Sequence, residues 1–192
     1  TYYQSLGYED LSTMFSRNER NGSARFVAMG GAFGAVGGDV TAMTINPAGI
    51  SIFNDSNASI AFRSRSTDYL TTYYGNSTTT QQDFFKVSNA GVVFTFNNYT
   101  IDEWSKLAMG INYRVLADFE DTFIAKGTSG FASFDNFPLD NSENPLVYDI
   151  ADNQQLSNFY NGDMSELSFA FSGVYEEKMH VGAGLNFYDL NF

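Results

Sequence analysis

The chain has 192 residues, no cysteine, a formal net charge of −12 and 43% hydrophobic residues. This acidic balance argues against nucleic-acid binding, which needs a basic surface, and the lack of cysteine excludes disulfides and thiolate chemistry. No window approaches the ~18 consecutive apolar residues of a transmembrane helix, whereas abundant Tyr, Phe, Thr, Asn and Ser suit strands joined by polar turns.

The first 21 residues are polar and aromatic. Leu11, Met14 and Phe15 have the spacing of one helical face, and Asp10 can cap such a helix. We therefore expect one or two helical turns here. The chain starts at Thr1 without an apolar leader, which we interpret as mature, processed material.

The segment Gly22–Phe53 has a composition unlike the rest of the chain. It holds seven of the 17 glycines among Ala, Val, Met, Phe and Ile residues, a mixture that suits a compact, buried and irregular coil. Three interpretations compete, and composition favours a plug packed inside something larger, closed by the turn Asn46-Pro47-Ala48-Gly49.

The other two interpretations fit less well. The spacing of Gly30, Gly34 and Gly38 is that of paired transmembrane helices, but the apolar run from Arg25 to Asp39 is shorter than the ~20 residues needed to span a bilayer. A phosphate-binding loop would follow a strand and be followed by a lysine, and neither is present.

The stretch from Ser23 to Val36, followed by Gly38-Asp39 and Asn46-Pro47-Ala48-Gly49, closely resembles the N-terminal hatch of the FadL/OmpP1/TodX outer-membrane transporters. It looks most like the branch found in Bacteroidota. The resemblance covers about 30 residues. Its motif positions are Arg25, Gly30, Gly31, Asp39, Asn46, Pro47 and Gly49.

That resemblance implies a fold and a function. The fold is a barrel of about 14 strands with the hatch filling its lumen. The function is passive movement of long-chain fatty acids or other hydrophobic molecules across the outer membrane of a Gram-negative bacterium.

Beyond Phe53 the hydrophobic period becomes two, which predicts strands. We expect a first strand from Ala58 to Tyr74, a loop over Gly75–Gln82 and a second strand over Asp83–Phe96. One face of the second strand carries apolar residues at Ala90, Val92, Phe94 and Phe96.

The predicted third strand, Ser105–Thr122, has the clearest alternation. Its opposite face mixes small residues with Lys, Arg, Asp and Glu, as a wet or plugged lumen would require, and the strand is long against the usual 5 to 6 residues. The apolar face reads Leu107, Met109, Ile111, Tyr113, Val115, Ala117 and Phe119.

The segment Phe123–Asp163 loses all periodicity and contains an acidic, Asn-rich run, which predicts a long loop. Alternation returns in a fourth strand, Glu166–Ser172. A tight turn at Glu176-Glu177-Lys178 leads to a fifth strand, Met179–Tyr188.

Short and long connections alternate, as in outer-membrane barrels. Tyr99 and Trp104 would form one interfacial aromatic girdle, and Tyr69, Tyr73 and Tyr74 the other. The predicted fold class is therefore all-β. It is a transmembrane antiparallel β-barrel of which about five strands are present, with residues 1–53 as N-terminal segment and hatch and residues 54–192 as the first strands.

Five strands in lipid would leave two open edges. Roughly ten unpaired backbone groups per edge, at several kcal/mol each, would cost on the order of tens of kcal/mol, far above a net stability of ~5 to 15 kcal/mol. We expect the chain to be the N-terminal part of a longer protein, or its edges to pair with another chain. Phe192 then marks a truncation.

Catalytic constellations are sparse, so we expect no enzyme, no cofactor and no metal. His180, the only histidine, is predicted to be a polar wall residue. Arg25 and Asp39 are expected to link plug to wall, or to line a permeation route. The acidic residues Asp140, Glu143, Asp149 and Asp152 lack the spacing of a calcium loop and suit a solvated loop better.

The expected function is a passive outer-membrane channel for hydrophobic molecules, gated by the plug. Its expected partners are outer-membrane lipid and a fatty-acid-like solute, which would bind near Phe26, Met29, Phe33 and Val36. The alternative is a barrel-anchored partner or shuttle component of a type IX secretion complex, favoured by the long loop. A soluble β-sandwich enzyme ranks third, because no nucleophile and base are assembled.

Overall fold

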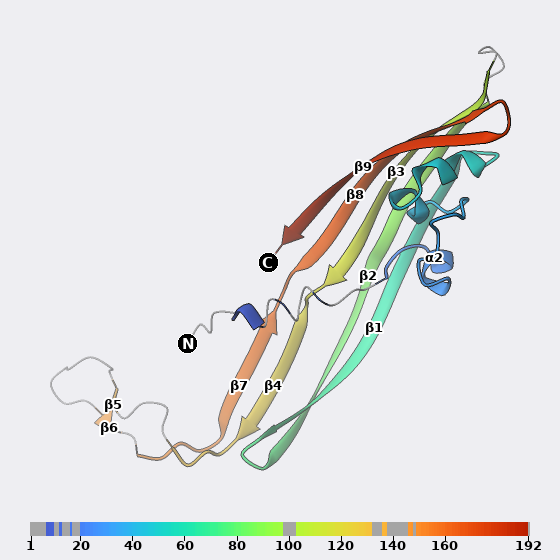
Figure 1. Cartoon of the computed structure of the whole chain (residues 1–192). Coiled ribbons are helices and arrows are strands. Elements are labelled where there is room, and N and C mark those ends of the chain that lie inside the picture. The colour runs from blue at the N-terminus through green and yellow to red at the C-terminus, as the bar shows by residue number, and fades with distance from the viewer. Residues whose placement is uncertain are drawn as a thin grey trace. The chain divides into compact units, whose positions relative to one another are not determined.

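The computed structural model describes residues 7–9, 12, 16, 20–97, 103–131, 136–137, 146–147 and 149–191. They form mostly antiparallel β-sheet, as expected for an all-β chain (Figure 1). The helices whose bounds lie within these ranges precede the strands: α2 (Ala24–Ala28), η1 (Thr41–Thr44) and η2 (Pro47–Ile52). The strands are β1 (Asn57–Tyr73), β2 (Asn76–Asn97), β3 (Trp104–Asp118), β4 (Asp121–Gly127), β5 (Asn136–Phe137), β6 (Leu146–Val147), β7 (Gln154–Tyr160), β8 (Asp163–Tyr175) and β9 (Met179–Asn191).

The chain divides into two compact units. Unit 1 comprises residues 1–64, 85–119 and 162–192, and unit 2 comprises residues 65–84 and 120–161. The main sheet has the strand order β1-β2-β3-β8-β9. Its pairs β2–β3, β3–β8 and β8–β9 are antiparallel. Strands β1 and β2 therefore contribute to both units, while β3, β8 and β9 belong to unit 1.

The loop predicted over Gly75–Gln82 is wrong. Only Tyr74 and Gly75 turn the chain, both with positive φ, and β2 starts at Asn76. This two-residue connection matches the twist of the flanking strands. The residues after the turn are polar, which is typical of a loop, but they form the start of β2, which pairs with β1.

The apolar face predicted for the third strand is interrupted. Between Val115 and Ala117 the pairing with β8 shifts register, which places Leu116 in a bulge. Ala117 and Phe119 are consequently buried instead of continuing the exposed apolar row, and β3 ends at Asp118.

The long loop predicted from Phe123 to Asp163 is also wrong in part. Its two ends form the antiparallel pair β4–β7, with Asp121 opposite Tyr160 and Gly127 opposite Gln154. Within unit 2 the Thr71 hydroxyl donates to the Ile124 carbonyl at 2.7 Å, and the Ile124 N–H donates to the Thr80 hydroxyl at 3.1 Å. Side chains of the β1–β2 hairpin therefore satisfy the backbone of β4.

The last hairpin agrees with its prediction. The chain turns at residues 176–178 between β8 and β9, with Glu176 and Glu177 at positive φ. Several predicted features lie outside the described residues, namely the helical face with Asp10, Leu11, Met14 and Phe15, the girdle residue Tyr99, the loop acids Asp140 and Glu143, and Phe192.

Candidate functional site

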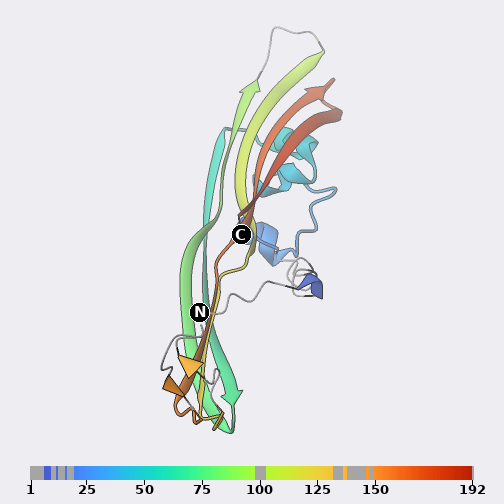
Figure 2. The same ribbon diagram turned by 90° about the vertical axis from the view of Figure 1, so that its left-hand side faces the viewer.

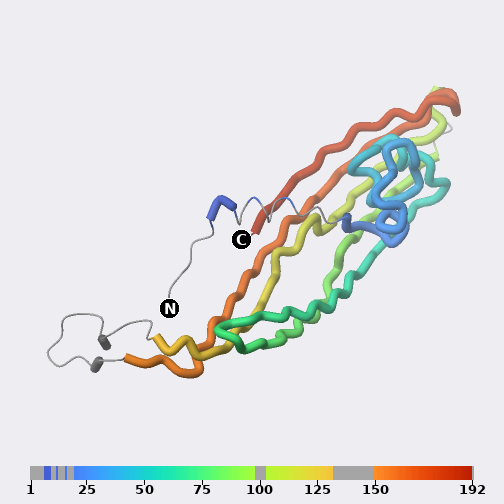
Figure 3. Tube along the Cα trace, turned by 60° about the horizontal axis from the view of Figure 1, so that its bottom comes forward, coloured from blue at the N-terminus to red at the C-terminus, as the bar shows by residue number. Residues whose placement is uncertain are grey.

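In unit 1 the glycine-rich segment, Gly22–Phe53, covers one face of the sheet. Figure 2 shows that its helices and coil all lie on the same side of the strands, and the tube in Figure 3 shows the segment folded back on itself. The face that it covers carries the small and polar residues, as the hydrogen bonds and close contacts below establish.

The opposite face is apolar and exposed. Its side chains are between 38% exposed, at Leu107, and 63% exposed, at Leu185. A water-soluble sheet buries its apolar face and exposes its polar one, so this sheet has the inverse arrangement. The exposed apolar residues on β2, β3, β8 and β9 are Phe94, Phe96, Leu107, Met109, Ile111, Tyr113, Leu167, Phe171, Met179, Val181, Leu185 and Phe187.

The covered face is built from small residues where the segment approaches. A Cβ added to Gly110 would lie 2.6 Å from the Met43 Cε, and one added to Gly182 would lie 2.6 Å from the Ala48 Cα. Such distances are far below van der Waals contact. At Gly182 the close atom belongs to the backbone, so glycine is required there for close approach. At Gly110 it is the end of the flexible Met43 side chain.

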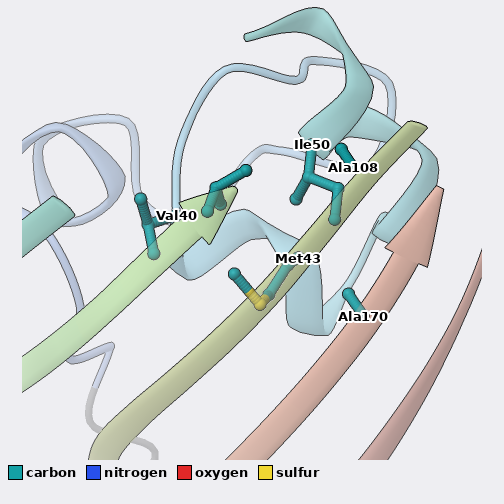
Figure 4. Packing of buried hydrophobic residues seen from close by; sticks show 6 residues of the cluster. Val40, Met43, Ile50, Ala108 and Ala170 are labelled. Carbon is teal, nitrogen blue, oxygen red and sulfur yellow. The ribbon is translucent and has the colours of Figure 1, made fainter. Parts of the chain in front are cut away.

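A small apolar core joins the segment to the sheet. Val40, Met43 and Ile50 of the segment belong to one buried cluster with Ala108 on β3 and Ala170 on β8 (Figure 4). Val93 on β2 completes this cluster, in which every member is buried. On this face, short side chains of the strands, such as Ala108 and Ala170, therefore pack against longer side chains of the segment.

The first part of the segment has a core of its own. Phe26 on α2 stacks on Phe33, with ring centroids 5.5 Å apart, and Ala42 joins them. Of the four residues expected to contact a solute, Phe26 and Phe33 are therefore buried against each other. Met29 and Val36 are exposed.

The charged motif residues act inside the segment. Arg25 donates to the Gly38 carbonyl at 3.1 Å and lies over the Phe33 ring. The Asp39 carboxylate accepts the Ser23 hydroxyl at 2.6 Å and the Thr41 N–H at 2.9 Å. These contacts differ from the expected link between plug and wall, because they stabilise the segment's own turns.

The motif glycines and the closing turn have clear backbone reasons. Gly30, Gly31 and Gly38 all have positive φ, which other residues adopt at a cost. At the closing turn Pro47 begins η2, and Asn46 precedes it as the N-cap residue. Gly49 accepts the Gly38 N–H at 3.1 Å and touches the Gly37 backbone, which leaves no room for side chains there.

Hydrogen bonds join the segment to the covered face of β8 and β9. The Ser172 hydroxyl donates to the Ala48 carbonyl at 3.1 Å, and Asn186 donates to the Thr44 carbonyl at 3.4 Å. His180 lies with its Nδ1 2.6 Å from the buried Ser51 hydroxyl. His180 therefore lies on the face of the sheet that the segment covers.

A transverse row of polar residues crosses the covered face. In register, Asn89 on β2 lies opposite Arg114 on β3, which lies opposite Glu166 on β8. Arg114 forms an ion pair with Glu166, which is only 1% exposed, and its guanidinium also lies 5.7 Å from the Phe26 ring centroid. The ion pair thus lies beside the segment.

Two grooves were not foreseen from the sequence, because each joins strands or segments distant in the chain. One, of about 430 Å³, runs between α2 and the β1–β2 hairpin and is lined mainly by Ala24, Val27, Ala28, Ala61, Phe62 and Arg63. The other, of about 450 Å³, lies against Trp104, Leu107, Phe171, Gly173, Val181 and Ala183.

Other kinds of site are not found in the described part of the chain. There, no three His, Asp or Glu side chains gather as metal ligands. None of the helices in that part combines the length and apolarity needed to cross a membrane.

Comparison with known proteins adds no assignment. No protein-family model, curated protein or solved structure matches this chain.

Proposed function

We propose that the chain forms part of an outer-membrane β-barrel of a Gram-negative bacterium, resembling the FadL/OmpP1/TodX transporters, and that it admits hydrophobic molecules such as long-chain fatty acids. The observation that carries this proposal is the inverted sheet: its apolar face is exposed, and its small and polar face is covered by the glycine-rich segment. Lipid is the surrounding that suits the exposed face, and a plugged lumen suits the covered one.

The aromatic pair at one end of the sheet supports a membrane boundary. Trp104 packs on Tyr175 with ring centroids 5.5 Å apart, and its ring also lies against Gly173. Aromatic residues of this kind mark the two interfaces of membrane barrels. Beyond this pair, the turn at residues 176–178 is made of charged side chains, which suits water.

Barrel closure is part of the proposal. In the five-stranded sheet β1 and β9 are the edge strands, and lipid cannot hydrogen-bond their outer N–H and C=O groups. We therefore infer that both edges pair with further strands, so that the covered face becomes the lumen. The glycine-rich segment would then be the hatch.

Transport requires the hatch to move. Phe26 and Phe33 fill the hatch core, so a solute reaches them only when the segment rearranges. The groove between α2 and the β1–β2 hairpin is mostly apolar and could accept an alkyl chain beside the closed hatch. No catalytic group is needed, because the solute crosses unchanged.

A disulfide staple tests the gating. These 192 residues hold no cysteine, so the double variant Pro47→Cys, Gly184→Cys introduces a single cysteine pair into them. A Cβ on Gly184 would lie 3.6 Å from the Pro47 Cβ, within the range that a disulfide spans. We expect uptake of tritiated oleate by liposomes containing the full-length protein to fall at least about tenfold when this pair is oxidised, and to recover on reduction.

Two controls make that experiment decisive. The single variant Gly184→Cys should transport normally under both conditions, because it cannot form the staple. Unchanged uptake by the oxidised, verified staple would contradict gating by the hatch. No uptake by any variant, including the unmodified protein, would contradict the channel itself.

A second candidate function is that of a membrane-anchored partner in type IX secretion. The observation that favours it is in unit 2, where Phe131, Leu156 and Phe159 are exposed on the segment that includes β4 and β7. Exposed aromatic residues are typical of protein interfaces. Co-purification of a stoichiometric secretion protein, without any bound lipid-like solute, would favour this candidate.

A further inference from the structure

Two buried side chains on neighbouring strands hold polar atoms without hydrogen-bond partners. They are the Asn112 Nδ2 on β3 and the Ser168 Oγ on β8, and the two residues lie directly opposite each other in the register. Asn112 is 0% and Ser168 is 1% exposed. Buried polar groups are nearly always paired, so these two adjacent atoms are left available to a ligand that reaches them when the segment moves away.

The network around Asn112 fixes which atom is unpaired. The Ser23 N–H donates to the Thr41 hydroxyl, so that hydroxyl gives its hydrogen to the Asn89 Oδ1. Asn89 in turn donates through its Nδ2 to the Asn112 Oδ1 at 2.6 Å. The remaining polar atom of Asn112 is therefore a donor N–H, at the end of a hydrogen-bonded chain that begins in the glycine-rich segment.

The surroundings select a class of ligand. Asn112 can only donate from this nitrogen, and the Ser168 hydroxyl can donate beside it, so the pair suits an acceptor oxygen. The next row along the strands is apolar, with Val93, Gly110 and Ala170 opposite one another and Met43 lying over Gly110. Hydrogen-bond donors beside a row of apolar residues suit an amphiphile, whose polar head and alkyl chain would contact the two in turn.

We propose that Asn112 and Ser168 form a head-group subsite, which binds a carboxylate or ester oxygen of an amphiphilic solute while the alkyl chain follows the apolar row. The subsite is closed by the glycine-rich segment, so the solute occupies it after that segment moves. The inference rests on the proposed function, because it names the chemistry that the lumen wall recognises.

The test compares two probes with the same tail. Tritiated dodecanoate carries the acceptor oxygens, and tritiated dodecane lacks them, and binding of each to the full-length protein in lipid nanodiscs is measured by scintillation proximity. We expect Ser168→Ala to weaken dodecanoate binding about tenfold, since a hydrogen bond to a charged group is lost, and to leave dodecane binding unchanged.

The matched control is Ser172→Ala, on the same face of the same strand. The Ser172 hydroxyl already donates to the Ala48 carbonyl, so its loss should affect both probes alike. Equal binding of dodecanoate by the unmodified protein and by Ser168→Ala would overturn the subsite, including the case in which only water occupies it. If neither probe binds the unmodified protein, the proposed function fails instead.

Discussion

Replacing Ile111 with arginine is expected to destabilise the protein in a bilayer by about 2–4 kcal/mol, the cost of a cation at the middle of a barrel's lipid face. Ile111 is in the central row of the exposed apolar face, opposite Phe169 on β8, which pairs with Leu185 on β9. If water surrounded this face, the same exposed position would accept arginine within about 0.5 kcal/mol. The measurement is reversible urea unfolding in phospholipid vesicles, followed by fluorescence of Trp104, the only tryptophan in these 192 residues.

Met179→Arg is the matched control for Ile111→Arg. Met179 belongs to the same exposed apolar face but is the first residue of β9, opposite Tyr175 and next to the charged turn. Near an interface the cost of arginine falls to about 0–1 kcal/mol. Equal free energies of unfolding for the two variants would contradict a lipid-facing sheet.

Gly182→Val is expected to displace the glycine-rich segment from the wall. A side chain at Gly182 would overlap the backbone of Ala48, which cannot rotate away as a side chain could. Overpacking of this kind costs about 1–3 kcal/mol, and because the contact joins segment to wall, the cost should weaken docking of the segment. We expect faster hydrogen exchange over residues 40–53 and higher uptake of hydrophobic solute.

Gly184→Ala is the control for that variant. Gly184 is two residues further along β9 on the same face, but the nearest atom to its added Cβ would be 3.5 Å away, an ordinary contact. This variant should exchange and transport like the unmodified protein. Equal exchange over residues 40–53 in Gly182→Val and the unmodified protein would show that the close contact does not hold the segment in place.

Local alternation predicted the faces of the sheet well. Leu107, Met109 and Ile111 share an exposed face because a strand's side chains alternate whatever surrounds it, so the pattern is visible in one strand alone. The pairing partners are not visible in this way. The β4–β7 pair joins residues that are 27 to 39 positions apart, and the segment that holds them carries no periodicity to indicate it.

Features that depend on register could not be predicted either. The bulge at Leu116 reverses which side chains face outward, and no local signal marks it. The pairing of Asn112 with Ser168 likewise follows from how β3 and β8 align. For the glycine-rich segment the sequence indicated an irregular, buried coil, but the segment holds three short helices and is only partly buried, with Val27, Ile45 and Ile52 exposed. The stacking of Phe26 on Phe33 depends on how the segment folds back on itself.

A spin-label scan of β9 distinguishes a sheet whose apolar face contacts lipid, and whose other face contacts the glycine-rich segment, from a sheet in water. Single cysteines at positions 181 to 187 carry the label, and its collisions with oxygen and with a water-soluble nickel chelate are compared in native-like bilayers. We predict high oxygen and low nickel accessibility at Val181, Ala183, Leu185 and Phe187, and low accessibility to both at Gly184, where an added side chain meets only ordinary contacts. High nickel accessibility at the first four positions would contradict the account, because it would place that face in water.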